Sequence, residues 1–310
     1  MALAINTNHK QSSTQAFLAC TRAAVLTLAL PLLMNLSLTG CSPADTTITP
    51  ETQTQTHSPA REAATLINND SFENNKLANF WSPELMTPTA GLITKEQTRA
   101  GKQAMRFSWK PTQADGTNKM LHSELATASP ANGETERWYG YSSFMPSANM
   151  ANDDQITIVS QWHGVADPGF SDSVPPLRFE VKSDQLQLVY VASSKPIVKL
   201  LQHPTSQKEI ALGTVSYDRW VDYVVHVKWD ANGKTGLLQV WQDGVLKVDD
   251  QNINIGYPQI QKPYWKVGLY CWTGKSRAAE KVIYCDEVRI GNATAGYDAV
   301  KPGRANNTAR

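Results

Sequence analysis

Apolar and polar positions alternate one by one along most of the chain between residues 100 and 290. A period of two is typical of β-strands, because successive side chains of a strand point to opposite faces of the sheet. The pattern predicts ten strands, at 102–110, 118–126, 137–145, 155–163, 177–181, 185–192, 220–230, 235–243, 264–272 and 281–290. Asn232-Gly233 and Asp243-Gly244 favour hairpin turns between them. No stretch of twelve residues has a helical period, so the sequence predicts an all-β protein.

Several predicted strands have one face that is apolar throughout. In 220–230 that face carries Val221, Tyr223, Val225, Val227 and Trp229. Strands of this kind bury one face against a second sheet, so we expect a sandwich or jelly roll of two antiparallel sheets. One sheet of such a sandwich often curves, and its concave face can hold a sugar chain.

The strand predicted at 264–272 has an unusual second face. Its first face is apolar, with Trp265, Val267, Leu269 and Cys271. Its second face holds two phenols, an ammonium, an indole and a glycine, namely Tyr264, Lys266, Gly268, Tyr270 and Trp272. We interpret this face as the floor of a cleft, with Gly268 leaving room for a ligand. The alternative is a strand covered by another layer.

Two earlier strands add groups that can donate or accept protons. In 118–126, strict alternation places Leu121, Ser123 and Leu125 inward and Met120, His122 and Glu124 outward. In 155–163 it places Ile156, Ile158, Ser160 and Trp162 inward and Thr157, Val159, Gln161 and His163 outward. An imidazole pair, a carboxylate, an amide and a phenol on three strands form a candidate site.

The ends of the chain differ in composition from its middle. Residues 1–41 contain basic residues, then an apolar run that ends in Leu38-Thr39-Gly40-Cys41, as expected of a secretory signal. This ending resembles a bacterial lipobox, which implies lipidation at Cys41 and an outer-membrane lipoprotein; an ordinary cleaved signal is the alternative. Residues 42–61 form a polar tether, 62–300 one large β domain and 301–310 a disordered tail.

Charge and cysteine content narrow the function classes. The chain has 29 basic and 28 acidic residues and a net charge of +1, so no global field favours nucleic acid. Cys271 and Cys285 flank a loop in near-mirror positions, and in an exported protein they can form a cross-strand disulfide. A reduced buried pair is the alternative, and neither cysteine shows metal-ligand spacing.

Three segments resemble the signature strands of jelly-roll polysaccharide lyases. They are His122-Ser123-Glu124-Leu125, Gln161-Trp162-His163 and Tyr264-Trp265-Lys266-Val267-Gly268-Leu269-Tyr270. Alginate lyases of family 7 carry Arg-x-Glu-Leu, Gln-x-His and Tyr-x-Lys-x-Gly-x-Tyr in this order, and glucuronan lyases of family 20 and heparin lyase I have related arrangements. His122 stands where alginate lyases have arginine, which favours the glucuronan lyase type. The likeness spans roughly residues 100–292.

This resemblance implies a concanavalin-like jelly roll that cleaves a uronic-acid polymer, foremost glucuronan, by β-elimination across C4 and C5. Tyr270 is then the proton carrier, with its pKa lowered from about 10 by Lys266. His122, Gln161 and His163 stabilise the charge on the substrate carboxylate or act as base. The expected substrate-binding residues are Glu124, Lys266, Arg178, Tyr264 and Trp272. We expect a monomer without a cofactor or catalytic metal, although this fold class leaves a structural Ca²⁺ open.

Other functions remain open at this point. The same fold can serve an alginate or glycosaminoglycan lyase, or a carbohydrate-binding module without activity. A glycoside hydrolase needs two carboxylates at matched positions, and no strand carries a Glu-x-Asp-x-x-Glu run. Hydrolysis is therefore disfavoured.

Overall fold

The structure is a computed structural model that describes residues 65–85, 87–114, 121–200 and 202–303. The predicted signal, Cys41, the tether and residues 304–310 lie outside this described part. All described residues belong to one compact unit. None of its helices is long and apolar enough to cross a membrane.

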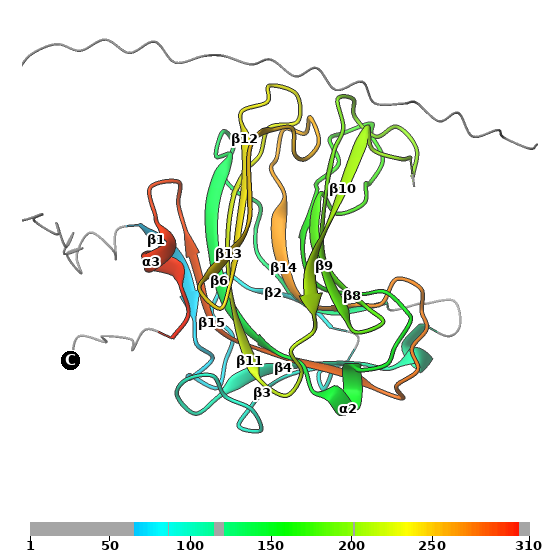
Figure 1. Cartoon of the computed structure of the whole chain (residues 1–310), viewed down its shortest axis with the longest axis vertical. Helices are drawn as coiled ribbons and strands as arrows, with labels where there is room; N and C mark the ends of the chain where they lie inside the picture. Colours follow the sequence, from blue (N-terminus) through cyan, green and yellow to red (C-terminus); the bar gives the residue numbers. More distant parts are fainter. Residues whose placement is uncertain (1–64, 86, 115–120, 201, 304–310) are drawn as a thin grey trace, which may run out of the picture. The chain divides into compact units, whose positions relative to one another are not determined.

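Two antiparallel sheets make up nearly all of the regular structure (Figure 1). The first sheet contains, in spatial order, β13 (Val245–Ile253), β12 (Gly236–Gln242), β11 (Trp220–Lys228), β6 (Glu136–Phe144), β15 (Lys281–Gly291), β4 (Ala104–Trp109) and β3 (Gly91–Thr94). One further strand, β1 (Leu66–Asp70), pairs with β15.

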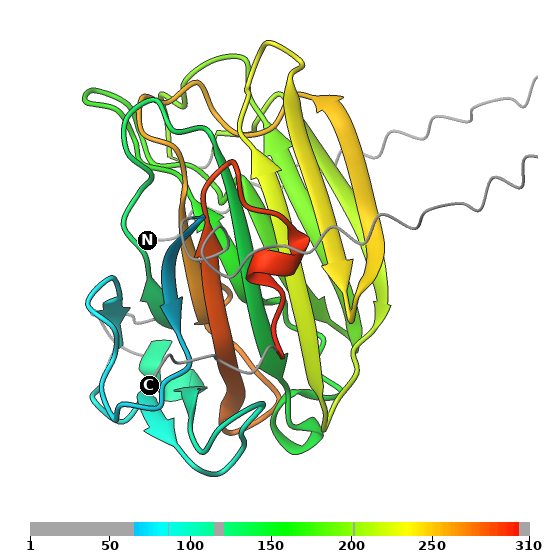
Figure 2. The ribbon, with the colours of Figure 1, turned by 90° about the vertical axis from the view of Figure 1, so that its left-hand side faces the viewer.

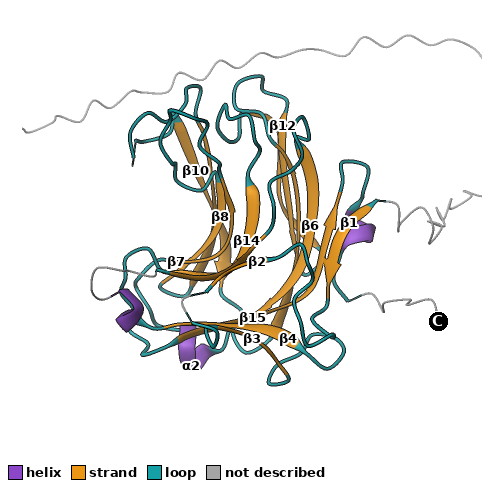
Figure 3. Ribbon diagram, turned by 180° about the vertical axis from the view of Figure 1, so that it is seen from behind, coloured by secondary structure: helices purple, strands orange, loops and turns teal. Residues whose placement is uncertain are grey.

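The second sheet has seven strands. They are, in order, β10 (Ser206–Thr214), β9 (Gln185–Ala192), β8 (Leu177–Lys182), β7 (Thr157–His163), β14 (Tyr264–Tyr270), β5 (His122–Ala126) and β2 (Ser82–Glu84). The described helical turns are η1 (Pro111–Ala114), α2 (Ser147–Met150) and α3 (Tyr297–Val300), and α3 packs on the outer face of the first sheet (Figure 2). Seen from behind, the regular structure is almost all strand, joined by loops and a few short helical turns (Figure 3), which confirms the predicted all-β sandwich.

Each of the ten predicted strands is present, with described ends that differ by a few residues; residues 118–120 of the strand predicted at 118–126, Met120 among them, lie outside the described residues. Five others were missed: β1, β2, β3, β10 and β13. Most of β10 and β13 is exposed, and each is an edge strand of its sheet. Neither needs a regular apolar face, so hydrophobic alternation gives no signal for them.

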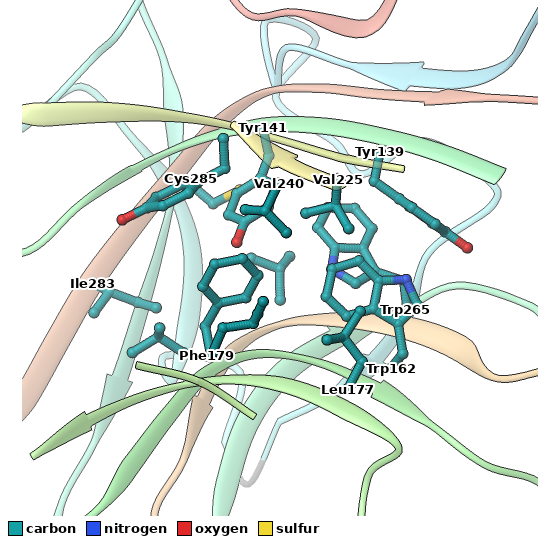
Figure 4. Packing of buried hydrophobic residues seen from close by; sticks show 14 of the residues in the cluster. Tyr139, Tyr141, Trp162, Leu177, Phe179, Val225, Val240, Trp265, Ile283 and Cys285 are labelled. Carbon is teal, nitrogen blue, oxygen red and sulfur yellow. The ribbon is translucent and has the colours of Figure 1, made fainter. Parts of the chain in front are cut away.

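Trp265 lies at the centre of the core between the sheets (Figure 4). Its ring centroid is 5.3 Å from that of Tyr141, 5.6 Å from that of Tyr139 and 6.2 Å from that of Trp162. Its indole Nε1 donates a hydrogen bond of 2.8 Å to Ser160 Oγ, which satisfies the buried polar atom. The apolar face of β14 is thereby anchored, and its other face is available for a site.

The predicted disulfide is wrong: Cys271 and Cys285 are buried free thiols. Cys271 follows β14 in the second sheet, whereas Cys285 belongs to β15 in the first. The mirror positions in the sequence suggested neighbouring strands, but β14 pairs with β5 and β7 instead. Burial raises the pKa of the Cys271 thiol to about 12, so the thiol stays protonated and unreactive.

A β-bulge in β7 corrects the predicted facing of its first half. The register against β8 shifts between Ile158 and Ser160. Val159 therefore joins the core, while Ile156 and Ile158 line a cleft on the other face. Strict alternation predicted the reverse, because it does not account for a bulge. One extra residue in a strand exchanges the faces of the residues on one side of it.

Candidate active site

The three strands that carry the candidate site lie side by side in the order β7, β14, β5. On one side of β14, Tyr270 is opposite His122 and Gly268 is opposite Glu124. On the other side, Lys266 is opposite Gln161. Directly opposite residues of an antiparallel pair point to the same face, so the sheet brings the predicted groups together.

A buried carboxylate lies at the centre of these groups. Glu124 has an exposed fraction of 0%, and Gln161 Nε2 donates to its Oε1 at 2.6 Å. Lys266 Nζ is 3.8 Å from Glu124 Oε2 and donates to Glu84 Oε2 at 2.7 Å. His122 Nδ1 lies 3.9 Å from a carboxylate oxygen of each glutamate. Glu124 was expected to bind substrate. Because it is fully buried, it instead interacts with Gln161, Lys266 and His122.

Glu84 belongs to this network and was missed by the sequence reasoning. It ends β2, a strand of three residues, which is too short to show any periodicity. Single atoms of Glu84, His122 and Glu124 lie within 4.8 Å of one another, and such a set of ligands can hold a cation. Here the ammonium of Lys266 supplies the positive charge beside both carboxylates.

Burial determines the protonation states in this network. It raises the pKa of Glu124 to about 7, although Lys266 and the Gln161 hydrogen bond act in the opposite direction. It also raises the pKa of Tyr270, and the charge of Glu124 adds to this shift while Lys266 opposes it. Lys266 thus acts in the expected direction, but the expectation of a net lowering of the Tyr270 pKa is wrong. The pKa of His122 is lowered by burial, so at neutral pH the imidazole is neutral and the phenol is protonated.

Gly268 has a different role from the one expected. Its φ is +139°, and a Cβ on it would lie 2.7 Å from the Cα of Glu124 and also contact the carbonyl of Ser123. The missing side chain makes space for the neighbouring strand β5 and leaves none there for a ligand.

At the other end of β14, Tyr264 is opposite His163 of β7. His163 Nδ1 is 2.8 Å from the carbonyl oxygen of Gly164, and the imidazole is 5.5 Å from the Tyr264 ring, centroid to centroid. A carbonyl can only accept, so Nδ1 carries a proton and Nε2 is the free nitrogen of the neutral ring. This Nε2 is 3.9 Å from Asp172.

A cleft of about 670 Å³ extends from Tyr270 across β7, β8, β9 and β10. The residues that line it are Ile156, Ile158, His163, Asp172, Ser173, Val174, Pro175, Arg178, Glu180, Lys182, Gln187, Leu200, Gln207, Glu209, Tyr270 and Trp272. Arg178 and Trp272, both expected at neighbouring sugar subsites, are among them. Trp272 is 50% exposed, whereas Arg178 is bonded to Glu180.

Residues 65–289 match the family model described as polysaccharide lyase. An endo-β-1,4-glucuronan lyase from the fungus Trichoderma reesei is 20% identical, with a TM-score of 0.62 over 78% of this chain and 100% of that chain. This likeness shows a shared fold.

Two alginate lyases are also similar, at lower scores. The family 7 enzyme A1-II' is 15% identical over 66% of this chain and 84% of that chain, with a TM-score of 0.49. The enzyme vAL-1 from Chlorella virus is 13% identical over 73% of this chain and 99% of that chain, also with a TM-score of 0.49. No curated protein sequence matches. Because the matched family model includes all three strands of the site, this chain belongs to the polysaccharide lyase family.

Proposed function

We propose that this lyase cleaves a polymer at 4-linked glucuronate by syn β-elimination, with Tyr270 as the acid and His122 as the base. The observation that carries the proposal is the placement of these two groups. They are directly opposite on adjacent strands, with ring centroids 6.1 Å apart, and both rise from the same face of the sheet. In glucuronate the C5 proton and the C4 oxygen lie on one face of the ring, so two groups on one floor can reach both.

The protonation states support these roles. Neutral His122 takes the C5 proton, the electron pair forms the C4–C5 double bond, and the C4–O bond breaks. The departing C4 oxygen takes the phenolic proton of Tyr270. Transfer of the proton from the His122 imidazolium to the Tyr270 phenolate then restores both groups. The lowered pKa of His122 and the raised pKa of Tyr270 keep the starting forms populated at neutral pH.

The site must also stabilise negative charge on the uronate carboxylate as C5 loses its proton. Gln161 uses one amide N–H for Glu124 and has a second one to donate, although the side chain is only 1% exposed. The Lys266 ammonium adds positive charge below the sugar. We assign the stabilisation of this charge to Gln161 and Lys266.

Glucuronan is the simplest substrate of this kind. Two observations favour glucuronan over alginate. The fold is similar to that of a glucuronan lyase, and His122 stands where alginate lyases have arginine. Mannuronate has the same arrangement at C4 and C5, so an alginate lyase acting on mannuronate is the second candidate.

The test is the substitution Tyr270→Phe, assayed by the ultraviolet absorbance of the new double bond on glucuronan and alginate. Loss of a proton donor should lower kcat by about 10²-fold or more. Tyr297→Phe is the control, because this phenol lies on α3 at the outer face of the first sheet, and it should retain the activity. A Tyr270→Phe enzyme close to the wild-type rate would refute the assignment. Binding of polymer without any turnover by the wild type would indicate a carbohydrate-binding module.

We further propose that the enzyme is exported and tethered to the outer membrane through a lipid on Cys41, and acts there as a monomer without a cofactor. The apolar run and the Leu-Thr-Gly-Cys ending support this location. The mass of the membrane-extracted protein checks it: an N-terminus at Cys41 with added acyl chains is expected, and an unmodified one would contradict the anchor.

A further inference from the structure

The cleft beyond Tyr270 offers little positive charge to a polyanion. Among the described residues that line it, the lysine and arginine side chains are Arg178 and Lys182. Asp172, Glu180 and Glu209 contribute three carboxylates. An enzyme that binds a chain with a carboxylate on every sugar would need the opposite balance.

Arg178 is not available to a substrate carboxylate. Its Nε donates to Glu180 Oε1, and its Nη1 donates to the carbonyl of Pro175 at 3.3 Å. Glu180 is only 4% exposed and also accepts a hydrogen bond of 2.8 Å from Gln187. A buried carboxylate thus balances the guanidinium, and removing Arg178 from this pair would leave that charge uncompensated.

The two other carboxylates of this part of the cleft suit hydroxyl groups. Glu209 is exposed and accepts a hydrogen bond of 2.8 Å from Gln207 Nε2. The side chain of Asp172 is 55% exposed. Carboxylate oxygens accept hydrogen bonds from sugar hydroxyls but repel a sugar carboxylate.

Apolar side chains line the cleft close to Tyr270. Ile158 is opposite Tyr270 across the β7–β14 pair, and Ile156, Leu200 and Trp272 also line the cleft. Leu200 is exposed, and the half-exposed indole of Trp272 offers a flat surface for a sugar ring. An uncharged sugar loses less solvation on such a surface than a uronate does.

We propose that the stretch of substrate bound across β8, β9 and β10, beyond the reacting unit, includes a neutral sugar. This inference rests on the proposed function, in which the reacting unit is glucuronate. The substrate class is then a heteropolysaccharide in which 4-linked glucuronate alternates with uncharged sugars. Homopolymers of uronate and highly sulfated polymers fit the cleft less well.

The first experiment compares kcat/KM of the wild-type enzyme on glucuronan, hyaluronan and heparosan. The last two alternate 4-linked glucuronate with neutral N-acetylglucosamine. We expect at least one of them to be cleaved about tenfold faster than glucuronan or better. Equal or faster cleavage of glucuronan overturns the neutral subsite and leaves the proposed function intact. Absence of the double-bond absorbance on every polymer overturns the proposed function itself.

The second experiment reverses one charge, with Glu209→Lys. Reversing an exposed charge near a carboxylate should raise kcat/KM on glucuronan about fivefold or more, and it should leave the better alternating polymer unchanged. Asp249→Lys is the matched control, because it makes the same charge change on an exposed residue of β13 in the other sheet. No gain on glucuronan, or an equal gain with Asp249→Lys, contradicts the proposal.

Salt provides an independent readout on the wild-type enzyme. If carboxylates of the cleft repel the neighbouring uronate, screening should lower the KM for glucuronan relative to that for the alternating polymer as salt rises. With a cationic subsite, the KM for glucuronan would instead rise relative to that for the alternating polymer as salt rises, and that result would overturn the inference.

Discussion

The phenol of Tyr270 is protonated at neutral pH because burial and the charge of Glu124 disfavour its anion more than Lys266 favours it. The sequence shows that a lysine lies four residues before this tyrosine, but not how deeply either is buried. Glu124 is a second example, since burial brings the pKa of an ordinary carboxyl to about 7. At this scale, the residue types of the site were predictable and their charges were not.

These shifts predict the pH dependence of kcat/KM. A base must be deprotonated, so activity should fall as the pH drops through the pKa of His122, which lies below its usual 6.5. An acid must be protonated, so activity should fall again as the pH rises through the pKa of Tyr270, above its usual 10. The expected profile is a broad plateau that includes neutral pH. Initial rates at low substrate concentration across this range measure it. A rate that climbs steadily from neutral to strongly alkaline pH would instead make the Tyr270 phenolate the base.

The strand β14 connects the core to the site. Its apolar face holds Trp265 in the core, and its other face presents Lys266 and Tyr270 between β5 and β7. Gly268 lets β5 approach closely at the position opposite Glu124. The two faces of this strand were predictable from alternation, whereas the contact that requires the glycine was not.

Replacing Gly268 with alanine should therefore destabilise the protein and disturb the site. The new Cβ would meet the backbone of β5, and φ of +139° is unfavourable for any other residue, so we expect a loss of about 2 kcal/mol or more in the free energy of unfolding. Denaturant unfolding measures it. Gly133→Ala is the control, because φ is +86° there but no atom lies within 4 Å of the added Cβ. Equal losses for the two variants would show that the contact with β5 costs nothing.

The bulge in β7 marks the limit of reasoning from periodicity within an element. Alternation correctly placed Gln161 and Trp162 on opposite faces, but it misplaced Ile158 and Val159. A bulge depends on how two neighbouring strands pair, and the sequence of one strand carries little trace of it. Its functional consequence is that Ile156 and Ile158 line the cleft.

In the whole molecule, packing between the two sheets holds the structure together without a disulfide among the described residues. Cys271 and Cys285 come from different sheets and are both fully buried in the shared core. They act as small apolar side chains there.

A reducing agent should therefore leave the Tm of the protein unchanged. Thiol titration gives the complementary result: at least two more thiols should react in denaturant than in the native protein, because Cys271 and Cys285 are inaccessible when folded. A Tm that falls on reduction, with no additional thiols in unreduced denatured protein, would show that the two cysteines are bonded.

The sequence by itself determined the ten strands with a regular apolar face, the all-β class and the residue types of the site. It did so because alternation and side-chain chemistry are local properties of a chain. Only the tertiary structure decided that β7, β14 and β5 are neighbours, that Glu84 joins them, and that Cys271 and Cys285 remain free thiols. The same holds for the proton on Tyr270 and for the pairing of Arg178 with Glu180. Strand order, burial and charge compensation depend on groups that are close in space and distant in sequence, and one strand's pattern does not record them.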